Sequence, residues 1–361
     1  MISESELFQS FKMATNDYTK GQGQKSKHWE GEYDNREVAF SPENLKNFRN
    51  NGLIDGLNRA RNTDNNFIEN HLNDLIQEVG EDFVNSSLDT KNIGNNLNFI
   101  KVKDKYVDVS DNFHIKFIYD MEKYIFSSTN IQVVCEIGGG YGNLVKHIKN
   151  KHNESKIILI DLPEANFYSA YYLQQHFPEA KILTYKDIND YTISKQEIKE
   201  YDFIVIPPWV KFSDDLEIDL FINTRSFMEM NYEIVEGYFN LIQKHIKVGG
   251  YFFNINKYYK NTVGHAVELD NYPYDNKWEV ILSRPSWKQE IKIHQLITQR
   301  LSHDDDKLNL ELKNIKSLKE KYLQKRKAIY FFEKFSLITN LLQKLLPKSL
   351  KEVIKKVINY N

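Results

Sequence analysis

The segment from Val133 to Asp161 constrains the fold of this chain more than any other part of it. Val133–Ile137 is an apolar, β-branched run with the length of a buried strand. A glycine-rich bend follows it, and residues 143–149 have the pattern of a helix start. The apolar run 157–160 predicts a second strand, which Asp161 closes. This order of strand, bend, helix, strand and acid is typical of one half of a nucleotide-binding α/β fold.

The bend has the spacing G-x-G-x-G, so it departs from the G-x-G-x-x-G of dinucleotide folds. Asn143 stands where the third glycine of that motif would fall, and Glu136 precedes the first glycine by two residues. A carboxylate there repels a pyrophosphate and favours a cationic ligand that carries an ammonium or a sulfonium. Bare backbone amides can approach such a ligand closely. The glycines that we expect to flank it are Gly138, Gly140 and Gly142.

This combination of acid, glycine bend and second acid resembles motif I of the class I S-adenosylmethionine (SAM) methyltransferases. The resemblance implies SAM as the cofactor and S-adenosylhomocysteine as its product. Glu136 would face the methionine ammonium or the amides of the bend, and Asp161 would bind the ribose. Asp187, just past a predicted third strand, would reach the adenine amine, although a turn or cap role is equally compatible with its position.

The rest of the core alternates strands and helices, which predicts an α/β fold with a doubly wound, Rossmann-like parallel sheet. We expect further strands at 181–185, 203–206, 220–223, 251–255 and 278–282. A helix is predicted from Lys288 to Arg300. In the part before the sheet, residues 99–109 predict a short hairpin or strand, and Ser110-Asp111 predicts the cap of a helix over 113–126.

Three regions follow from this pattern. Residues 1–126 read as a mostly helical N-terminal extension that covers an acceptor pocket, 127–300 as the SAM-binding methyltransferase domain, and 301–361 as a basic, amphipathic helical region.

Charge and composition exclude several classes of function. The 361 residues carry 48 Lys and Arg against 50 Asp and Glu, so nothing global indicates a nucleic-acid partner. The single cysteine, Cys135, lies in the first core strand, which excludes a disulfide framework. The N-terminus lacks the pattern of a signal peptide, and no apolar run is long enough to cross a membrane, so we expect a cytosolic protein. The run Asp304–Asp306 has the composition of a helix cap, and we expect no metal site.

A second resemblance is more particular. The segments Asn223–Met230, Tyr238-Phe239 and Phe253–Asn256, together with Glu136–Gly142 and Asp161–Pro163, resemble the putative sugar O-methyltransferase family of bacterial surface-polysaccharide gene clusters. The N-terminal segments Ser26–Trp29 and Asn47–Arg49 share the likeness, which covers roughly residues 25 to 295. It implies a sugar hydroxyl as the methyl acceptor.

A sugar hydroxyl is a poor nucleophile at neutral pH, so a base should assist the transfer. His265 is one candidate because its loop follows the fifth strand, and Glu229, in the family-like motif, is the other. Structural roles for both residues stay open. Asn223, Arg225 and Tyr258 are the expected substrate-binding residues. Arg225 would pair with an acidic sugar or a phosphate, or would remain a solvated loop charge.

The C-terminal part is locally basic: from Lys313 onward, 13 Lys and Arg stand against 3 Glu. Its apolar residues fall on one helical face, which favours either an anionic membrane surface or a glycosyltransferase partner, with packing on the protein's own core as the alternative. A peripheral position on the inner face of the cytoplasmic membrane is therefore one possibility for a cytosolic chain.

The sequence as a whole predicts a SAM-dependent O-methyltransferase that acts on a sugar nucleotide or a glycan. Two other interpretations remain open. One is a methyltransferase for phenols or antibiotics, and the other is a SAM-fold scaffold without catalytic activity in a glycan-assembly complex.

Overall fold

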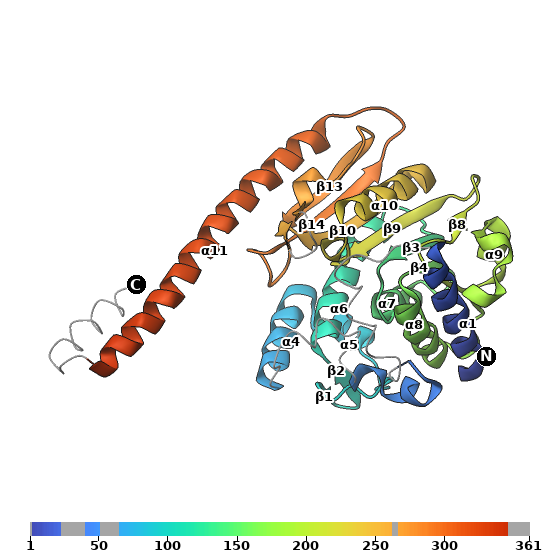
Figure 1. Ribbon diagram of the computed structural model, residues 1–361, viewed down its shortest axis with the longest axis horizontal. Coiled ribbons are helices and arrows are strands. Elements are labelled where there is room, and N and C mark those ends of the chain that lie inside the picture. The colour runs from blue at the N-terminus through green and yellow to red at the C-terminus, as the bar shows by residue number, and fades with distance from the viewer. Residues whose placement is uncertain (1, 23–39, 51–64, 262–265, 346–361) are drawn as a thin grey trace.

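The computed structural model describes residues 2–22, 40–50, 65–261 and 266–345, with side chains up to residue 327. Their central element is an eight-stranded sheet with the order β13-β14-β10-β9-β3-β4-β7-β5. Every neighbouring pair from β10 to β5 is parallel, and β14 alone runs antiparallel to both of its neighbours. The predicted doubly wound, Rossmann-like α/β fold is thereby confirmed (Figure 1).

The central strands are continuous apolar runs because helices cover both of their faces. The strands of the sheet are β3 (Val133–Ile137), β4 (Lys156–Ile160), β5 (Ile182–Thr184), β7 (Phe203–Ile206), β9 (Ile218–Thr224), β10 (Ile246–Lys257), β13 (Trp278–Pro285) and β14 (Ile293–Arg300). Short pairs outside it are β1 (Ile100–Val102) with β2 (Lys105–Val107), β6 (Thr192–Ile193) with β8 (Lys211–Phe212), and β11 (Tyr259–Lys260) with β12 (Val267–Glu268).

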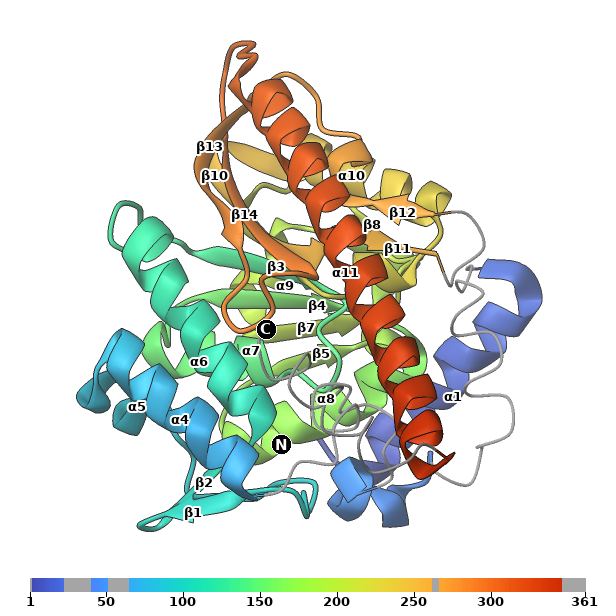
Figure 2. The same ribbon diagram turned by 90° about the vertical axis from the view of Figure 1, so that its left-hand side faces the viewer.

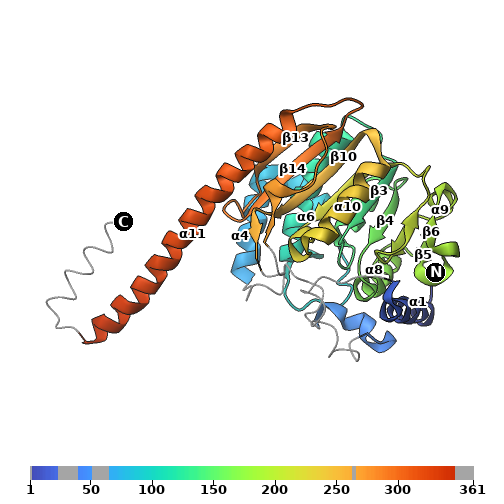
Figure 3. The ribbon, with the colours of Figure 1, turned by 45° about the horizontal axis from the view of Figure 1, so that its top comes forward.

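Alternate residues of each strand enter two separate apolar cores. Val134 and Leu159 belong to the core under α6, α7 and α8, whereas Cys135 and Ile158 belong to the core under α10. Figure 3 shows this three-layer arrangement. The helices are α1 (Glu4–Asp17), α4 (Asn65–Val79), α5 (Glu81–Ser87), α6 (Val109–Met121), α7 (Asn143–Lys151), α8 (Pro163–His176), α9 (Lys195–Glu200), α10 (Tyr232–His245) and α11 (Lys307–Leu345).

The helix predicted from Lys288 to Arg300 is wrong. Residues 293–300 form β14, which lies between β10 and β13. Ile293, Leu296 and Ile297 have the i, i+3, i+4 spacing of a helix face, and this spacing suggested the wrong structure. All three are buried because strands flank the segment on both sides and the sheet faces are covered, so tertiary pairing overrides the local pattern.

The region before the sheet has two elements close to their predicted places. Residues 100–107 form the β1–β2 hairpin. The helix predicted from residue 113 begins earlier, at Val109, because Asp108 rather than Ser110 is its cap. Asp108 and Asp111 each accept a hydrogen bond from the other's backbone N–H, which forms a capping box.

The long helix α11 leaves the body beside β13 and extends past it (Figure 1), and in Figure 2 it runs across the view in front of the body. Its 39 residues correspond to roughly 58 Å at 1.5 Å per residue. The first part is fixed to the body: Leu308 and Ile315 are buried, and Lys319 forms ion pairs with Glu268 and Asp270. Within the described ranges, no helix combines the length and the apolar character needed to span a bilayer.

Candidate functional site

The bend after β3 requires glycine for steric reasons. Gly138, Gly140 and Gly142 have φ values of 74°, 58° and 87°, a region that disfavours other residues. A Cβ atom on Gly138 would lie 2.2 Å from the Cβ of Ser226. One on Gly139 would lie 2.2 Å from a methyl carbon of Leu159 and 2.9 Å from Glu136 Oε2. The bend is therefore a close-packed backbone surface at the N-terminal end of α7.

Asp161 closes the opposite side of this bend. The pairing of Ile137 with Ile160 brings the carboxyl ends of β3 and β4 together. Gly140 N donates to Asp161 Oδ2 at 2.8 Å, and Leu162 N donates to Oδ1 at 2.7 Å. Burial raises the pKa of Asp161 to about 7, although the two hydrogen bonds from backbone amides act in the opposite direction. Each carboxylate oxygen keeps a lone pair that can accept a further donor, such as a ribose hydroxyl.

Glu136 is the most unusual residue of the site. Its side chain is 1% exposed, and its Oε2 atom has no hydrogen-bond partner among the described residues. Burial, and next the charge of Asp161, raise the pKa of Glu136 to about 8. A buried carboxylate without a partner for one oxygen is costly unless a cation or a donor completes it. The two acids therefore make the carboxyl edge of β3 and β4 complementary to a cationic ligand with hydroxyl donors.

Asn223 has a structural role in the described residues, and the substrate contact predicted for it stays a prediction. It is fully buried at the end of β9, and its Nδ2 donates to Ile137 O at 2.9 Å and to Ser226 Oγ at 2.5 Å. Its Oδ1 accepts from Phe227 N at 3.2 Å and from Asn256 Nδ2 at 2.8 Å. All of its hydrogen-bonding capacity is thus used to fix the loop after β9 against the end of β3.

Tyr258 likewise has structural contacts, and its predicted substrate contact stays a prediction. Its ring is buried, its hydroxyl lies 2.9 Å from His294 Nδ1, and its centroid lies 5.2 Å from that of Tyr322 in α11. Tyr258 therefore helps to attach α11 to the sheet.

Asp187 lies apart from the other predicted cofactor residues. It is exposed after β5, and β7 separates β5 from β4, so two strand spacings divide Asp187 from the strand of Asp161. Asp187 accepts a hydrogen bond from Thr184 at 3.2 Å and lies 3.4 Å from Lys186 Nζ. This geometry is that of a turn residue, the alternative that the sequence left open.

The remaining predicted residues lie beyond the end of β9. Arg225 has a φ of 69°, and its Nη1 donates to Gln289 Oε1 at 2.7 Å. Glu229 is partly buried at the end of a 3-10 helix (Phe227–Glu229), close enough to Asp161 to raise the pKa of Asp161 further, after Glu164. His265 lies outside the described residues, as do Ser26–Trp29.

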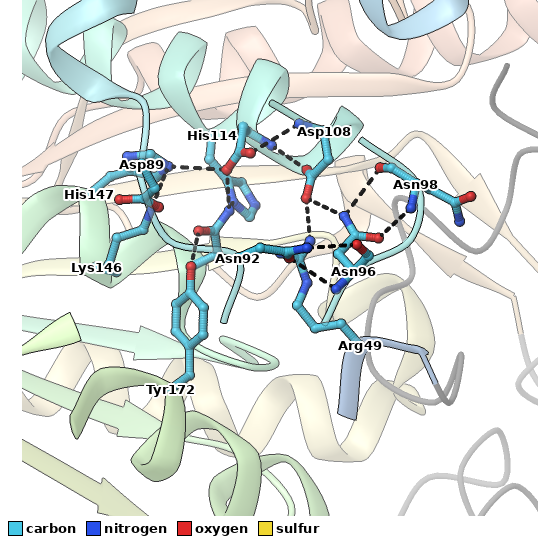
Figure 4. Close-up of polar contacts among 12 residues, drawn as sticks. Arg49, Asp89, Asn92, Asn96, Asn98, Asp108, His114, Lys146, His147 and Tyr172 are labelled. Carbon is cyan, nitrogen blue, oxygen red and sulfur yellow. Dashed lines mark hydrogen bonds and ion pairs between the residues drawn. The ribbon is translucent and has the colours of Figure 1, made fainter. Parts of the chain in front are cut away.

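A buried polar cluster beside the bend was missed at the level of sequence (Figure 4). Asn143, the first residue of α7, donates to Asp111 Oδ1 at 3.3 Å and lies 2.9 Å from His114 Nδ1, while Tyr172 donates to Asn143 Oδ1 at 2.9 Å. Burial lowers the pKa of His114 to about 3, so its imidazole is neutral at pH 7. The only signal in the sequence was the Asn at position 143, since its partners come from α6 and α8.

The same cluster continues into the N-terminal segments. Arg49 donates to Asp108, whose Oδ2 also accepts from Asn96 at 2.8 Å, and Lys146 forms a 2.5 Å ion pair with Asp89. These contacts fix the N-terminal region to the helix that follows the bend (Figure 4). In the part of the chain that the structure describes, no group of three or more His, Cys, Asp or Glu side chains is arranged to hold a metal ion.

Comparisons with known proteins are weak. No protein-family profile and no curated protein match the sequence. Among solved structures, the chain is similar to the mitomycin 7-O-methyltransferase MmcR, with 12% identity and a TM-score of 0.33 over 53% of this chain and 57% of that chain. The N-methyltransferase NodS from Bradyrhizobium japonicum, in complex with S-adenosyl-L-homocysteine, gives 12% identity and a TM-score of 0.36 over 52% and 87% of the two chains. A SAM-dependent methyltransferase from Clostridium acetobutylicum gives 10% identity and a TM-score of 0.36 over 53% and 91%.

The chain thus spans little more than half the length of MmcR. Because these similarities are weak, the function has to be inferred from the residues of the site.

Proposed function

We propose that the bend between β3 and α7 binds S-adenosylmethionine, and that the protein transfers its methyl group to a hydroxyl of a sugar. The observation that carries this proposal is the buried, unpartnered Oε2 of Glu136 beside Asp161. A ligand with a positive charge and a ribose diol supplies what these two acids lack, namely a cation and hydroxyl donors.

The chemistry of these residues suits such a ligand. The amides of the bend and the carboxylate of Glu136 would lie along the methionine part, and Asp161 would accept from the ribose hydroxyls. Once bound, the sulfonium supplies an activated methyl group. The task of the chain is then to align the acceptor oxygen with that methyl group and to exclude water.

The acceptor would approach from the segment after β9, where Glu229 lies next to the acids of the bend. Glu229 remains our candidate for the base that takes the hydroxyl proton, together with His265. We propose a sugar nucleotide or a glycan as the acceptor because of the sequence motif of residues 223–230. S-adenosylhomocysteine would be the second product.

Calorimetry with S-adenosylhomocysteine tests the cofactor site. We expect binding to the native chain and a loss of roughly 10- to 100-fold in affinity for Glu136→Gln and Asp161→Asn, as for a lost hydrogen bond to a charged group. Asp187→Asn is the matched control, and it should bind as the native chain does. An absence of binding to the native chain, or equal binding by all four proteins, would contradict the proposal.

Mass spectrometry of products tests the reaction. Incubation with SAM and sugar nucleotides or glycans should give a product heavier by one methylene. Methyl transfer to phenols but to no sugar would contradict the proposed sugar acceptor and indicate an aromatic one. Tight cofactor binding without transfer to any acceptor would favour a scaffold.

A further inference from the structure

Four basic residues from four different elements gather at the carboxyl edge of β9 and β10. They are Arg225 after β9, Lys257 at the end of β10, Lys260 in β11 and Arg326 in α11, and we call them the basic cluster.

The backbone brings these residues together. Thr224 pairs with Ile255, and Arg225 N donates to Ile255 O at 2.7 Å, so Arg225 and Lys257 leave neighbouring strands at the same edge. On the other side, the ring of Tyr258 lies 5.2 Å from that of Tyr322. Arg326 follows Tyr322 by four residues, so it lies on the same face of α11.

Lys257 is partly buried and forms neither a hydrogen bond nor an ion pair with any described side chain. Burial, and then the charges of Lys260 and Arg225, lower the pKa of Lys257 to about 8, with Arg326 acting in the same direction. Glu229 is the acid that opposes this shift. The nearby acids Glu268 and Asp270 are engaged by Lys319, at 3.0 and 2.7 Å.

Among the described residues, the fully buried lysines have a carboxylate partner, whereas Lys257 is only partly buried. Lys116 lies 2.5 Å from Asp120, and Lys146 lies 2.5 Å from Asp89. Lys257 has no such carboxylate partner among the described residues, and the neighbouring charges that lower its pKa belong to other basic residues. An ammonium in such a place is unfavourable in the free protein and is stabilised when an anion binds.

The basic cluster is linked to the glycine bend through Ser226, the residue next to Arg225 in the sequence. Ser226, which follows Arg225, donates to Ile137 O at 3.0 Å and closes against Gly138. An anion held by the cluster would therefore lie on the acceptor side of the proposed methyl-donor site.

We infer that the basic cluster binds the diphosphate of the acceptor, which is therefore a sugar carried as a glycosyl diphosphate. This inference rests on the proposed function and narrows its substrate class. Two or more phosphate charges match several Lys and Arg groups, among which Arg225 also donates to Gln289. A nucleotide-linked and a lipid-linked sugar share this chemistry.

Calorimetry with inorganic pyrophosphate tests the site on the full chain saturated with S-adenosylhomocysteine. We expect binding that weakens with added salt and falls roughly tenfold or more in Lys257→Gln. Lys257→Arg should retain most of the affinity. Lys211→Gln, which removes an exposed lysine of β8, is the control and should leave the affinity unchanged. Loss of an ammonium that has no partner should not destabilise the fold. The unfolding temperature of Lys257→Gln should therefore equal that of the native chain or be slightly higher.

The outcomes separate the two proposals. If S-adenosylhomocysteine binds but pyrophosphate does not, or if Lys257→Gln binds pyrophosphate normally, the diphosphate site is refuted and the cofactor site stands. Failure to bind S-adenosylhomocysteine would refute the cofactor site, and the pyrophosphate titration of the free chain would still decide on the cluster. Preference for glucuronate over pyrophosphate would also overturn the inference. Uridine diphosphate and farnesyl diphosphate then distinguish the two carriers, since the tighter ligand indicates the natural one.

Discussion

The backbone N–H of Gly140 donates to Asp161 Oδ2 at 2.8 Å, so the bend after β3 is tied directly to the acid that ends β4. Two strands that are neighbours in the sheet thereby hold one loop in one conformation. The loop is preorganised, and the amides that point away from Asp161 keep their directions when a ligand arrives.

Gly138→Ala should destabilise the protein. A side chain at a φ of 74° is strained, and its Cβ would overlap Ser226, so we expect a loss of at least about 2 kcal/mol in the free energy of unfolding. Gly237→Ala is the matched control, because it lies inside α10 and a Cβ added there would meet no atom within 4 Å. That control should gain roughly 0.5–1 kcal/mol. Urea unfolding of both variants measures the difference, and equal effects would contradict the steric account.

Glu136→Gln should change the pH dependence of stability. The pKa of Glu136 is about 8 in the folded chain, above its ordinary 4.5, so the folded state holds a proton that the unfolded state releases. The stability that this residue contributes is complete below pH 4.5 and is lost as the pH rises through 8. The slope is on the order of 1 kcal/mol per pH unit. Unfolding curves of the two proteins between pH 5 and 8 should diverge, with the variant more stable at the upper end; parallel curves would refute the assignment.

The affinity for the cofactor should rise as Glu136 loses its proton, whereas the stability of the fold falls. The ammonium of S-adenosylhomocysteine would bind the ionised form of Glu136, so the affinity for this ligand should rise from pH 6 to 8, with Asp161, whose pKa is about 7, adding to the rise. In Glu136→Gln the rise should shrink to the share of Asp161. Calorimetry at several pH values measures both. A flat profile in the native chain would show that neither carboxylate meets the ligand's charge.

Asn223→Ala should act on stability rather than on substrate binding. It removes the acceptor of Phe227 N and Asn256 Nδ2, and each buried group left unsatisfied costs about 1–3 kcal/mol. Asn309→Ala, which truncates an exposed amide of α11, should change stability by no more than about 0.5 kcal/mol. Chemical denaturation compares the two. A variant that unfolds like the native chain but has a raised KM for the acceptor would support the substrate role predicted for Asn223.

Shortening the chain after Lys327 tests the proposal that the C-terminal region binds an anionic membrane surface. The contacts of Leu308, Ile315, Lys319 and Tyr322 with the body remain, so cofactor binding should persist. Retention on vesicles with anionic lipids should fall to the level seen with neutral vesicles. If the shortened and the full chain sediment alike with anionic vesicles, the membrane proposal fails and a protein partner becomes the better explanation.

Local chemistry explains what could be predicted from the sequence. β3, β4 and the glycine bend were found because apolar runs, glycine and two acids lie within 29 residues, from Val133 to Asp161. Their pattern reflects constraints that act along the chain, such as strand burial and backbone conformation. The sheet as a whole followed from strand–helix alternation.

What could not be predicted depends on contacts between distant segments. Asn223 reads as a polar residue at a strand end, where ligands often bind, and only the amide of Asn256 shows that its bonds are already used. Asp187 follows β5, and the sequence does not reveal that β7, later in the chain, lies between β5 and β4. The helical spacing of Ile293, Leu296 and Ile297 was overridden by pairing on both sides of β14.

The adjacency of Arg225 and Ser226 has a consequence for how such a protein can diverge. A single peptide unit joins the wall of the glycine bend to the edge where the sheet presents its cations. Any backbone shift that re-aims one residue displaces the other. Substitutions that change the preferred acceptor should therefore accumulate in side chains of β11 and α11, where the chain can vary without disturbing the glycine bend.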